Sequence, residues 1–164
     1  MHSILSYVGI TRVLFYVVLS RSNQSKEETY EERCQENNIP IIKRCSGGGT
    51  ILQGPFCLNY SLILPIEQNT PTETIGQTND YILEKHQQAL SKLTKDKIEV
   101  KGYTDLTKNG LKISGNAQKR KRKALLFHGT FIIDSINDLV TRYLKHPSKE
   151  PDYRKKRSHQ TFIT

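Results

Sequence analysis

The chain has 164 residues, of which 35% are hydrophobic and 25% charged, and its formal net charge at pH 7 is +9. This composition excludes a fibrous or wholly disordered protein, and the length is sufficient for one domain with a buried core. The positive charge favours an acidic macromolecule or a phosphate-bearing ligand, although a solvated basic surface would produce the same value.

The three cysteines, Cys34, Cys45 and Cys57, have a spacing that matches neither a zinc site nor a disulfide framework. Free thiols are typical of a reducing compartment, so we expect a cytoplasmic protein. Because Cys45 and Cys57 lie in predicted strand and turn segments, we expect both thiols to pack against neighbouring side chains.

The first twenty residues are rich in apolar side chains, but Arg12 interrupts them. The uninterrupted run 13–19 is too short to span a bilayer. Its β-branched and aromatic residues predict a strand over 13–19, with a signal peptide or membrane segment as the alternative interpretation. We therefore expect no association with a membrane.

Ser25, followed three residues later by Glu28, is typical of a capping box and predicts a helix over 26–37 that ends before Pro40. Strands and turns follow, bounded by glycine and proline. The predicted segments are a strand at 40–44, a turn at 46–49, and strands at 50–53 and 58–64.

The polar stretch 67–78 contains Pro71 and Gly76 and is predicted as a loop. Apolar residues at helical spacing then predict a helix over 79–93. His86 lies on or near the apolar face of that helix. Nothing around it has metal-ligand spacing, so we expect a packed histidine rather than a ligand.

The clearest hairpin signal is Asn109-Gly110, because a type I′ turn requires positive φ at both central positions. It predicts strands over 98–107 and 111–114, with Lys112 just after the turn. Gly115 then suggests a second turn directly after the strand.

The last part of the chain predicts a strand over 124–134 and a helix capped by Asp134 or Ser135, which Pro147 ends. The remaining segment, 148–164, is polar and basic.

The run Gly47-Gly48-Gly49 allows the backbone to approach a ligand and to point N–H groups at it, although a tight hairpin turn is the simpler interpretation. Arg44 adds a planar guanidinium suited to phosphate or carboxylate, and Lys112 adds a point charge suited to a developing anion. An exposed strand lysine is the alternative for Lys112. Neither a Walker phosphate loop nor a dinucleotide fingerprint is present.

Five segments in this order resemble the lipoate–protein ligase A family of the biotin/lipoate ligase superfamily, and the resemblance covers about residues 14–163. The segments are Arg44 to Thr50, Leu58-Asn59-Tyr60-Ser61, Gly102 to Leu106, Lys112 to Ala117, and Phe127-His128-Gly129-Thr130. The resemblance implies an α/β (α+β) fold with a mixed β-sheet and flanking helices, similar to the biotin ligase catalytic domain. It also implies one catalytic domain over residues 1–164 that is shorter at both ends than family members.

The resemblance further implies a two-step reaction with ATP and Mg²⁺. Lipoate or octanoate is activated to the acyl-adenylate and then transferred to a lysine of a lipoyl domain. The implied acceptor is an acidic lipoyl domain of a 2-oxoacid dehydrogenase or a glycine-cleavage protein, and no nucleic acid is expected.

The same resemblance implies roles for individual residues. Lys112 contacts the carboxyl and phosphoryl oxygens of the reacting centre, and Arg44 lies near the same phosphate. Asp105 is a candidate for nucleotide or magnesium contact. The remaining implied positions line the acyl and adenylate pocket (Ser46, Gly47, Gly48, Gly49), border the nucleotide (Gly115, Ala117), or lie under the pocket in a structural or ligand-binding role (His128).

Two other functions stay open. One is an octanoyl or lipoyl transferase that uses acyl carrier protein as donor and a cysteine thioester, which requires an activated thiol. The other is a degenerate, non-catalytic family member or a basic nucleic-acid-binding protein. In a ligase or a transferase, the basic segments 119–123 and 154–157 would attract an acidic acceptor protein. In a nucleic-acid-binding protein, the same segments would bind nucleic acid.

Overall fold

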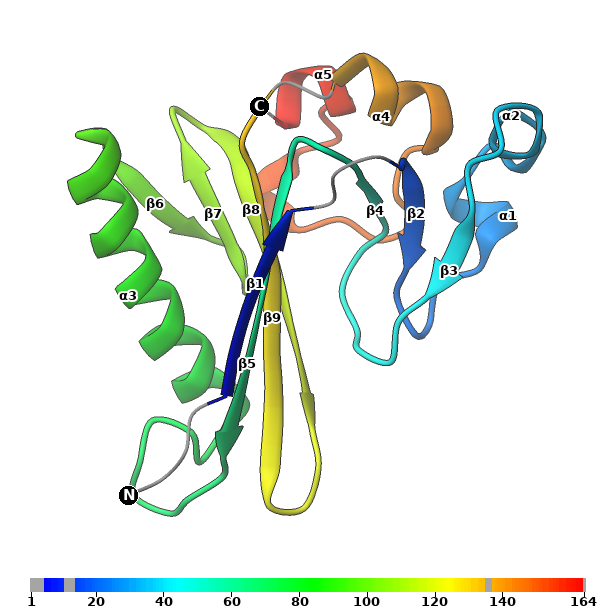
Figure 1. The fold of residues 1–164 in the computed structure, drawn as a ribbon. Helices are drawn as coiled ribbons and strands as arrows, with labels where there is room; N and C mark the ends of the chain where they lie inside the picture. The colour runs from blue at the N-terminus through cyan, green and yellow to red at the C-terminus, as the bar shows by residue number, and fades with distance from the viewer. Residues whose placement is uncertain (1–4, 11–13, 135–136, 164) are drawn as a thin grey trace.

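The computed structural model describes residues 5–10, 14–134 and 137–163, and within these ranges the strands form two sheets (Figure 1). The larger sheet has the order β1-β5-β9-β8-β7-β6, and the smaller has the order β3-β2-β4. The strands are β1 (Leu5–Ile10), β2 (Tyr16–Leu19), β3 (Ile41–Lys43), β4 (Ile51–Gln53), β5 (Cys57–Pro65), β6 (Ile98–Lys101), β7 (Asp105–Lys108), β8 (Leu111–Arg120) and β9 (Ala124–Ile132).

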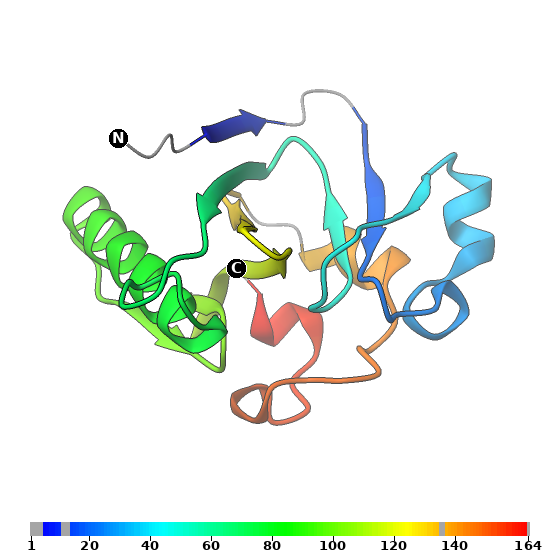
Figure 2. The ribbon, with the colours of Figure 1, turned by 90° about the horizontal axis from the view of Figure 1, so that it is seen from below.

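Helices flank both sheets. The longest, α3, covers one face of the larger sheet beside β6. The shorter helices α1, α2 and α4 lie beside the smaller sheet, and α5 also contacts β8 of the larger one (Figures 1 and 2). The helices are α1 (Ser25–Glu28), α2 (Glu31–Glu36), α3 (Ile75–Thr94), α4 (Asn137–Tyr143), the 3₁₀ helix η1 (Asp152–Arg154) and α5 (His159–Phe162). Neighbours in the larger sheet are antiparallel, whereas β2 pairs parallel with β3 and antiparallel with β4.

Apolar side chains fill the space between these layers. Leu83 of α3 packs on Ile98 and Leu106 of the larger sheet. A separate cluster, which includes Val17, Leu52 and Val140, joins the smaller sheet to α4. His86 is packed edge-on against Tyr60 and Phe131, so the prediction of a packed histidine is confirmed.

The N-terminal apolar stretch forms strands. β2 begins at Tyr16, later than the predicted start of the strand over 13–19, and Val13 lies outside the described residues. The sequence did not predict β1, which pairs antiparallel with β5 along its whole length. Within the described residues, no helix has both the length and the apolar character needed to cross a membrane.

The prediction of one helix over 26–37 is wrong, because Thr29 is extended and separates α1 from α2. Thr29 forms a β-bridge with Leu144, so pairing with the distant chain end overrides local helix propensity. The capping box is also wrong. Ser25 Oγ donates to Glu31, and the buried Glu28 carboxylate accepts from Ser148.

Two further boundaries differ from the predictions. Helix α3 starts at Ile75 inside the predicted loop 67–78, because Thr74 Oγ1 caps it by accepting from the Gln77 N–H at 3.2 Å. The predicted strand 98–107 is two strands, β6 and β7, with Gly102 at φ +57° in the turn between them.

The Asn109-Gly110 hairpin is confirmed, with φ of 52° and 77° at its two central residues. Strand β8, however, runs on to Arg120, so Gly115 lies inside a strand and the predicted turn there is wrong. Gly115 pairs with Asp105 on one side and with Thr130 on the other. Strand β9 ends at Ile132, before the predicted limit of 134.

Gly129 of β9 lies directly opposite Asn116 of β8, and the absence of a side chain at Gly129 is required there. A Cβ at Gly129 would overlap Asn116 Oδ1 and lie 2.8 Å from Tyr60 Cε1. We expect Gly129→Ala to lower the free energy of unfolding by about 3 kcal/mol, as overpacking of a core does. Urea denaturation measures this loss.

The matched control is Gly76→Ala, because a Cβ there would meet open space in the first turn of α3. Alanine is favoured over glycine in helices, so this variant is expected to be more stable than the original by about 0.5–1 kcal/mol. Equal unfolding free energies for the two variants would contradict the packing described at Gly129.

Candidate functional site

A cavity of about 470 Å³ lies between the two sheets and the C-terminal segment. Its volume is in the range of pockets that bind small molecules and cofactors. The apolar part of its wall includes Val18 and Leu52 from the smaller sheet, and Leu144 and Phe162 from the C-terminal helices. The cavity therefore depends on segments from both ends of the chain.

Most of the residues predicted from the sequence meet at this cavity. The lining includes Arg44, Gly48, Gly49, Asp105, Lys112, Gly115, Ala117 and His128. Ser46 is 1% exposed and reaches the site through a contact with His128, while Gly47 reaches it through its carbonyl oxygen. The structure thus brings the three motif segments around residues 46, 112 and 128 into one place.

A β-bulge sets the direction of Lys112. Leu106 lies opposite Ser114 but Thr107 lies opposite Lys112, so Ile113 is an extra residue in β8. In a regular strand, the side chains of residues 112 and 115 would point to opposite faces of the sheet. The extra residue places both on the same face. The Lys112 side chain accordingly crosses Gly115, where a Cβ would lie 3.0 Å from Lys112 Cε.

Asp105 is the immediate partner of Lys112. Its Oδ1 atom lies 2.8 Å from Lys112 Nζ, and its Oδ2 atom accepts a hydrogen bond from the Tyr153 hydroxyl at 2.7 Å. Asp105 is buried, whereas the Lys112 side chain is 26% exposed, so the carboxylate is the partner more shielded from water. A protonated lysine has three donors, which leaves two on Lys112 for a ligand in the cavity.

The magnesium contact implied for Asp105 stays a prediction. Among the described residues, no cluster of three or more His, Cys, Asp or Glu side chains is present, and both oxygens of Asp105 already have partners. The residues around Asp105 do not fit a metal site built by the protein. Mg²⁺ in enzymes that bind nucleotides is often held largely by phosphate oxygens and water, with few protein ligands.

Arg44 binds the glycine-rich turn itself. Its Nη2 atom donates to the carbonyl oxygens of Gly47 and Gly49, each at 2.7 Å, and its Nε atom donates to Ser46 Oγ at 3.1 Å. Gly48 has a φ of +94°, and a Cβ there would lie 2.9 Å from Arg44 Nη2. Residues 46–49 therefore bend around the Arg44 guanidinium group. Burial lowers the pKa of Arg44 from its ordinary value.

Ser46 links this turn to β9. Its Oγ atom lies at hydrogen-bond distance, 2.6 Å, from His128 Nε2 and also accepts from Arg44 Nε. Burial, together with the positive charge of Arg44, lowers the pKa of His128 below its ordinary value. The neutral form of His128 therefore predominates at pH 7.

A ring of polar side chains in the cavity wall escaped the sequence analysis. Gln53 Nε2 donates to Thr130 Oγ1 at 2.9 Å, and Thr130 donates to Asn59 Oδ1 at 2.6 Å. Asn59 Nδ2 closes the ring by donating to Gln53 Oε1 at 2.9 Å. The three residues come from β4, β5 and β9. Only the polar Asn59 within an apolar strand was a signal in the sequence.

The charged side chains of the wall favour an anionic ligand. Cations outnumber carboxylates among the lining residues, which include Arg44, Lys112, Lys145, Lys149 and Arg154 against Glu28 and Asp105. Cys45, which we expected to pack, is exposed beside Arg44, whereas Cys34 and Cys57 are buried.

A family model described as the Lipoyl protein ligase A/B catalytic domain matches residues 15–164. The chain belongs to this family. The family resemblance read from the sequence is therefore confirmed, and so is the mixed β-sheet with flanking helices that it implied.

Relatives in the Lipoyl protein ligase A/B family carry different names. Lipoate-protein ligase LplJ of Bacillus subtilis (strain 168) is 30% identical over 138 residues, which cover 81% of this chain and 40% of that protein. Inactive lipoate–protein ligase 2 of Plasmodium falciparum (isolate 3D7) is 31% identical over 177 aligned positions, covering 90% and 46%. Octanoyltransferase LipM of Exiguobacterium sp. is 27% identical over 149 residues, which cover 76% of this chain and 52% of that protein. The chain spans less than half the length of the first two.

Solved structures share the fold. A bi-partite lipoate protein ligase from Thermoplasma acidophilum, described with its E2 lipoyl domain, superposes with a TM-score of 0.78 at 16% identity, covering 97% of this chain and 61% of that one. A lipoate-protein ligase A bound with ATP superposes with a TM-score of 0.67 at 18% identity, covering 96% and 65%. At these identities the likeness shows the common fold.

The neutral state of His128 makes a prediction about pH. Because its folded pKa is depressed, the unfolded chain binds more protons once the pH falls below about 6.5, and stability is lost in that direction. We expect the melting temperature to be lower at pH 5.5 than at pH 7.5. This difference should be smaller in His128→Asn than in the original protein. Calorimetry of both proteins at both pH values measures the difference.

The control is Gln88→Asn, because Gln88 is an exposed side chain on α3 that does not titrate. This variant should keep the pH slope of the original protein. A slope in His128→Asn as steep as in the original would show that His128 is not held neutral by the fold.

Proposed function

We propose that this chain is the catalytic part of an ATP-dependent lipoate–protein ligase, which activates lipoate or octanoate as the acyl-adenylate and transfers it to a lysine of a lipoyl domain. The observation that carries the proposal is the meeting of Lys112, the Arg44-bound glycine turn and His128 at one cavity. Membership of the lipoyl ligase family supports the same reaction class.

In the first step, a carboxylate oxygen of the acyl substrate attacks the α-phosphorus of ATP, and the bond to the β-phosphate oxygen breaks to release pyrophosphate. Negative charge is redistributed over the phosphoryl oxygens. Lys112 has two donors free of Asp105 to stabilise this charge. The exposed backbone of Gly48 and Gly49 adds N–H donors, so catalysis depends mainly on orientation and fixed charge.

In the second step, the neutral amine of the acceptor lysine attacks the acyl carbon, and the bond to the AMP oxygen breaks as the amide forms. The amine proton leaves to solvent. His128 is an unsuitable base, because its Nε2 atom is occupied by Ser46. We assign His128 and Ser46 to holding the glycine turn against β9, and Gly115 and Ala117 to bordering the nucleotide.

The two basic segments have different surroundings: of residues 154–157 only Lys155 and Lys156 are exposed, whereas all of residues 121–123 are exposed. Arg154 is 4% exposed, lies over the Phe162 ring and is near Glu150, so it is part of the interior. The hairpin joining β8 to β9 extends past the glycine turn, and Lys121, Arg122 and Lys123 are exposed at its tip (Figure 1). We therefore place the docking of the acidic lipoyl domain on residues 121–123.

The activity is tested by incubating the protein with ATP, octanoate and a lipoyl domain and measuring pyrophosphate release. Lys112→Ala is expected to lower the rate about 10²–10³-fold, as removal of an oxyanion donor does, while circular dichroism stays unchanged. Lys92→Ala, on the exposed side of α3, is the control and should retain full activity. Full activity in Lys112→Ala would remove Lys112 from the reacting centre.

An octanoyltransferase is the second candidate, favoured by the relative of that name and by the exposed Cys45 beside Arg44. It predicts octanoyl transfer from acyl carrier protein without ATP, and loss of this transfer in Cys45→Ser. That result, together with no pyrophosphate release, would replace the ligase proposal. Absence of both reactions would indicate a non-catalytic member, as the name of the Plasmodium relative describes for that protein.

The docking surface predicts a separation between the two steps. Replacing Lys121, Arg122 and Lys123 by Glu should raise the KM for the lipoyl domain about tenfold, whereas acyl-adenylate formation should keep its rate. The control carries Glu at Lys92, Lys95 and Lys97, which are exposed on or near the C-terminal end of α3. Equal losses in both triple variants would show a general effect of net charge instead.

A further inference from the structure

The C-terminal segment 145–163, here called the C-terminal strap, crosses the β7–β8 hairpin close to Lys112. Arg157 Nη1 donates to the carbonyl oxygen of Gly110 at 3.1 Å, next to the hairpin turn. Ile163 forms a β-bridge with Lys112 itself. Tyr153 donates to Asp105. The strap therefore meets the hairpin at three points, in the turn, in β8 and in β7.

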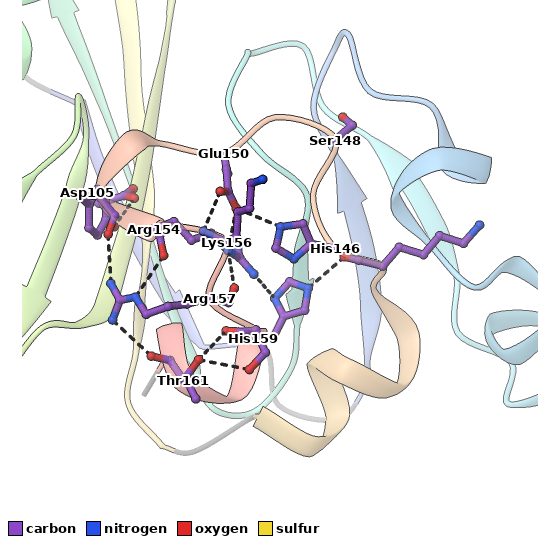
Figure 3. A network of polar contacts seen from close by, with 12 residues as sticks. Asp105, His146, Ser148, Glu150, Arg154, Lys156, Arg157, His159 and Thr161 are labelled. Carbon is purple, nitrogen blue, oxygen red and sulfur yellow. Dashed lines mark hydrogen bonds and ion pairs between the residues drawn. The ribbon is translucent and has the colours of Figure 1, made fainter.

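The strap has its own rigid interior. Phe162 is buried under the guanidinium groups of Arg154 and Arg157, at 4.5 Å and 5.1 Å from its ring centroid. Arg154 Nε donates to the carbonyl oxygen of Arg157 at 3.0 Å, and Glu150 accepts from the Lys156 N–H at 2.8 Å (Figure 3). These bonds lock the strap as a unit, so a side chain on it has a fixed position.

Tyr153 is the strap residue that reaches the ion pair. Its ring lies 5.3 Å from Phe162, and a Cβ on Gly102 would lie 3.3 Å from Tyr153 Cε1. The ring is thus placed between the strap interior and the β6–β7 turn. Burial, and then the charge of Asp105, raises the pKa of Tyr153, so its hydroxyl stays protonated and acts as a donor.

Asp105 needs a second partner to orient Lys112. The terminal torsion of an aspartate is broad, so one contact leaves the carboxylate free to rotate. The Tyr153 hydroxyl at 2.7 Å from Oδ2 fixes the carboxylate plane, and Oδ1 then holds Lys112 Nζ at 2.8 Å. With Gly115 leaving space under Lys112 Cε, the ammonium group has one defined position at the cavity wall.

We infer that Tyr153 is a positioning residue, which acts through Asp105 to aim the Lys112 ammonium group at the reacting phosphate. The role in catalysis rests on the adenylation reaction proposed above. The orientation of Lys112 by Tyr153 and Asp105 is a property of the structure that is measurable without that reaction.

Acyl-adenylate formation is compared in the original protein, Tyr153→Phe, Asp105→Asn and the double variant. Tyr153→Phe keeps the ring and removes one hydrogen bond to a charged group, so kcat should fall about tenfold with little change in the KM for ATP. In the Asp105→Asn background, the same substitution should have little further effect. Tyr81→Phe, exposed on α3, is the control and should leave kcat unchanged.

The double variant separates positioning from packing. If Tyr153 only packs the strap, Tyr153→Phe would lower kcat by the same factor in the original protein and in the Asp105→Asn background. Additive effects of this kind would overturn the inference. A fall in kcat in Tyr81→Phe equal to that in Tyr153→Phe would overturn it as well.

A second measurement needs no enzymatic activity. Limited acylation with sulfosuccinimidyl acetate, followed by mass spectrometry, gives the reaction rate of each lysine relative to exposed Lys92. Tyr153→Phe should raise the rate at Lys112 several-fold, because its ammonium group is less firmly held, and Tyr81→Phe should not. An unchanged rate at Lys112 would refute the positioning role. If the original protein releases no pyrophosphate, the proposed reaction fails and this labelling alone decides the role of Tyr153.

Discussion

The site depends on the contacts that the Asn116 side chain makes with neighbouring strands. This side chain accepts from the Tyr60 hydroxyl of β5 at 2.6 Å, donates to the carbonyl of Thr104 before β7 at 2.7 Å, and occupies the space that Gly129 of β9 leaves open. One buried amide thus joins three strands and the turn before a fourth. Because a shift of one residue would reverse the facing of every side chain in β8, this contact determines whether Lys112, Gly115 and Ala117 reach the cavity.

The two predicted cations of the site serve different purposes. Arg44 donates its hydrogen bonds to carbonyl oxygens of the glycine turn. Its positive charge therefore acts on the cavity through this turn, whose conformation it stabilises. Lys112 has a single carboxylate partner and retains donors that point to the cavity. A planar guanidinium suits the first task because it binds several carbonyl oxygens at once, and a compact ammonium suits the second.

The C-terminal strap brings a short polar segment into contact with the cavity wall. Its basic residues suggested a surface for partners, yet Arg154 and Arg157 both lie over the Phe162 ring and build a small core. Apart from lysines of the strap such as Lys155 and Lys156, exposed positive charge lies at the β8–β9 hairpin, at the end of the strands that carry Lys112 and His128. Relatives named as ligases, as an inactive ligase and as octanoyltransferases resemble this chain, so the fold by itself does not specify the reaction.

Local patterns in the sequence were sufficient for the Asn109-Gly110 hairpin, the packed His86 and the family itself, whereas the expected hairpin around residues 47–49 is wrong because β3 and β4 each pair with β2. Each confirmed prediction depends on residues close together along the chain or on a fixed motif order. The interruption of the first helix at Thr29, the bulge at Ile113, the Gln53–Asn59–Thr130 ring and the contact of Tyr153 with Asp105 were decided by the tertiary structure alone. Each of these depends on segments distant in sequence, whose pairing changes backbone direction and hydrogen-bond partners in ways that local propensity does not encode.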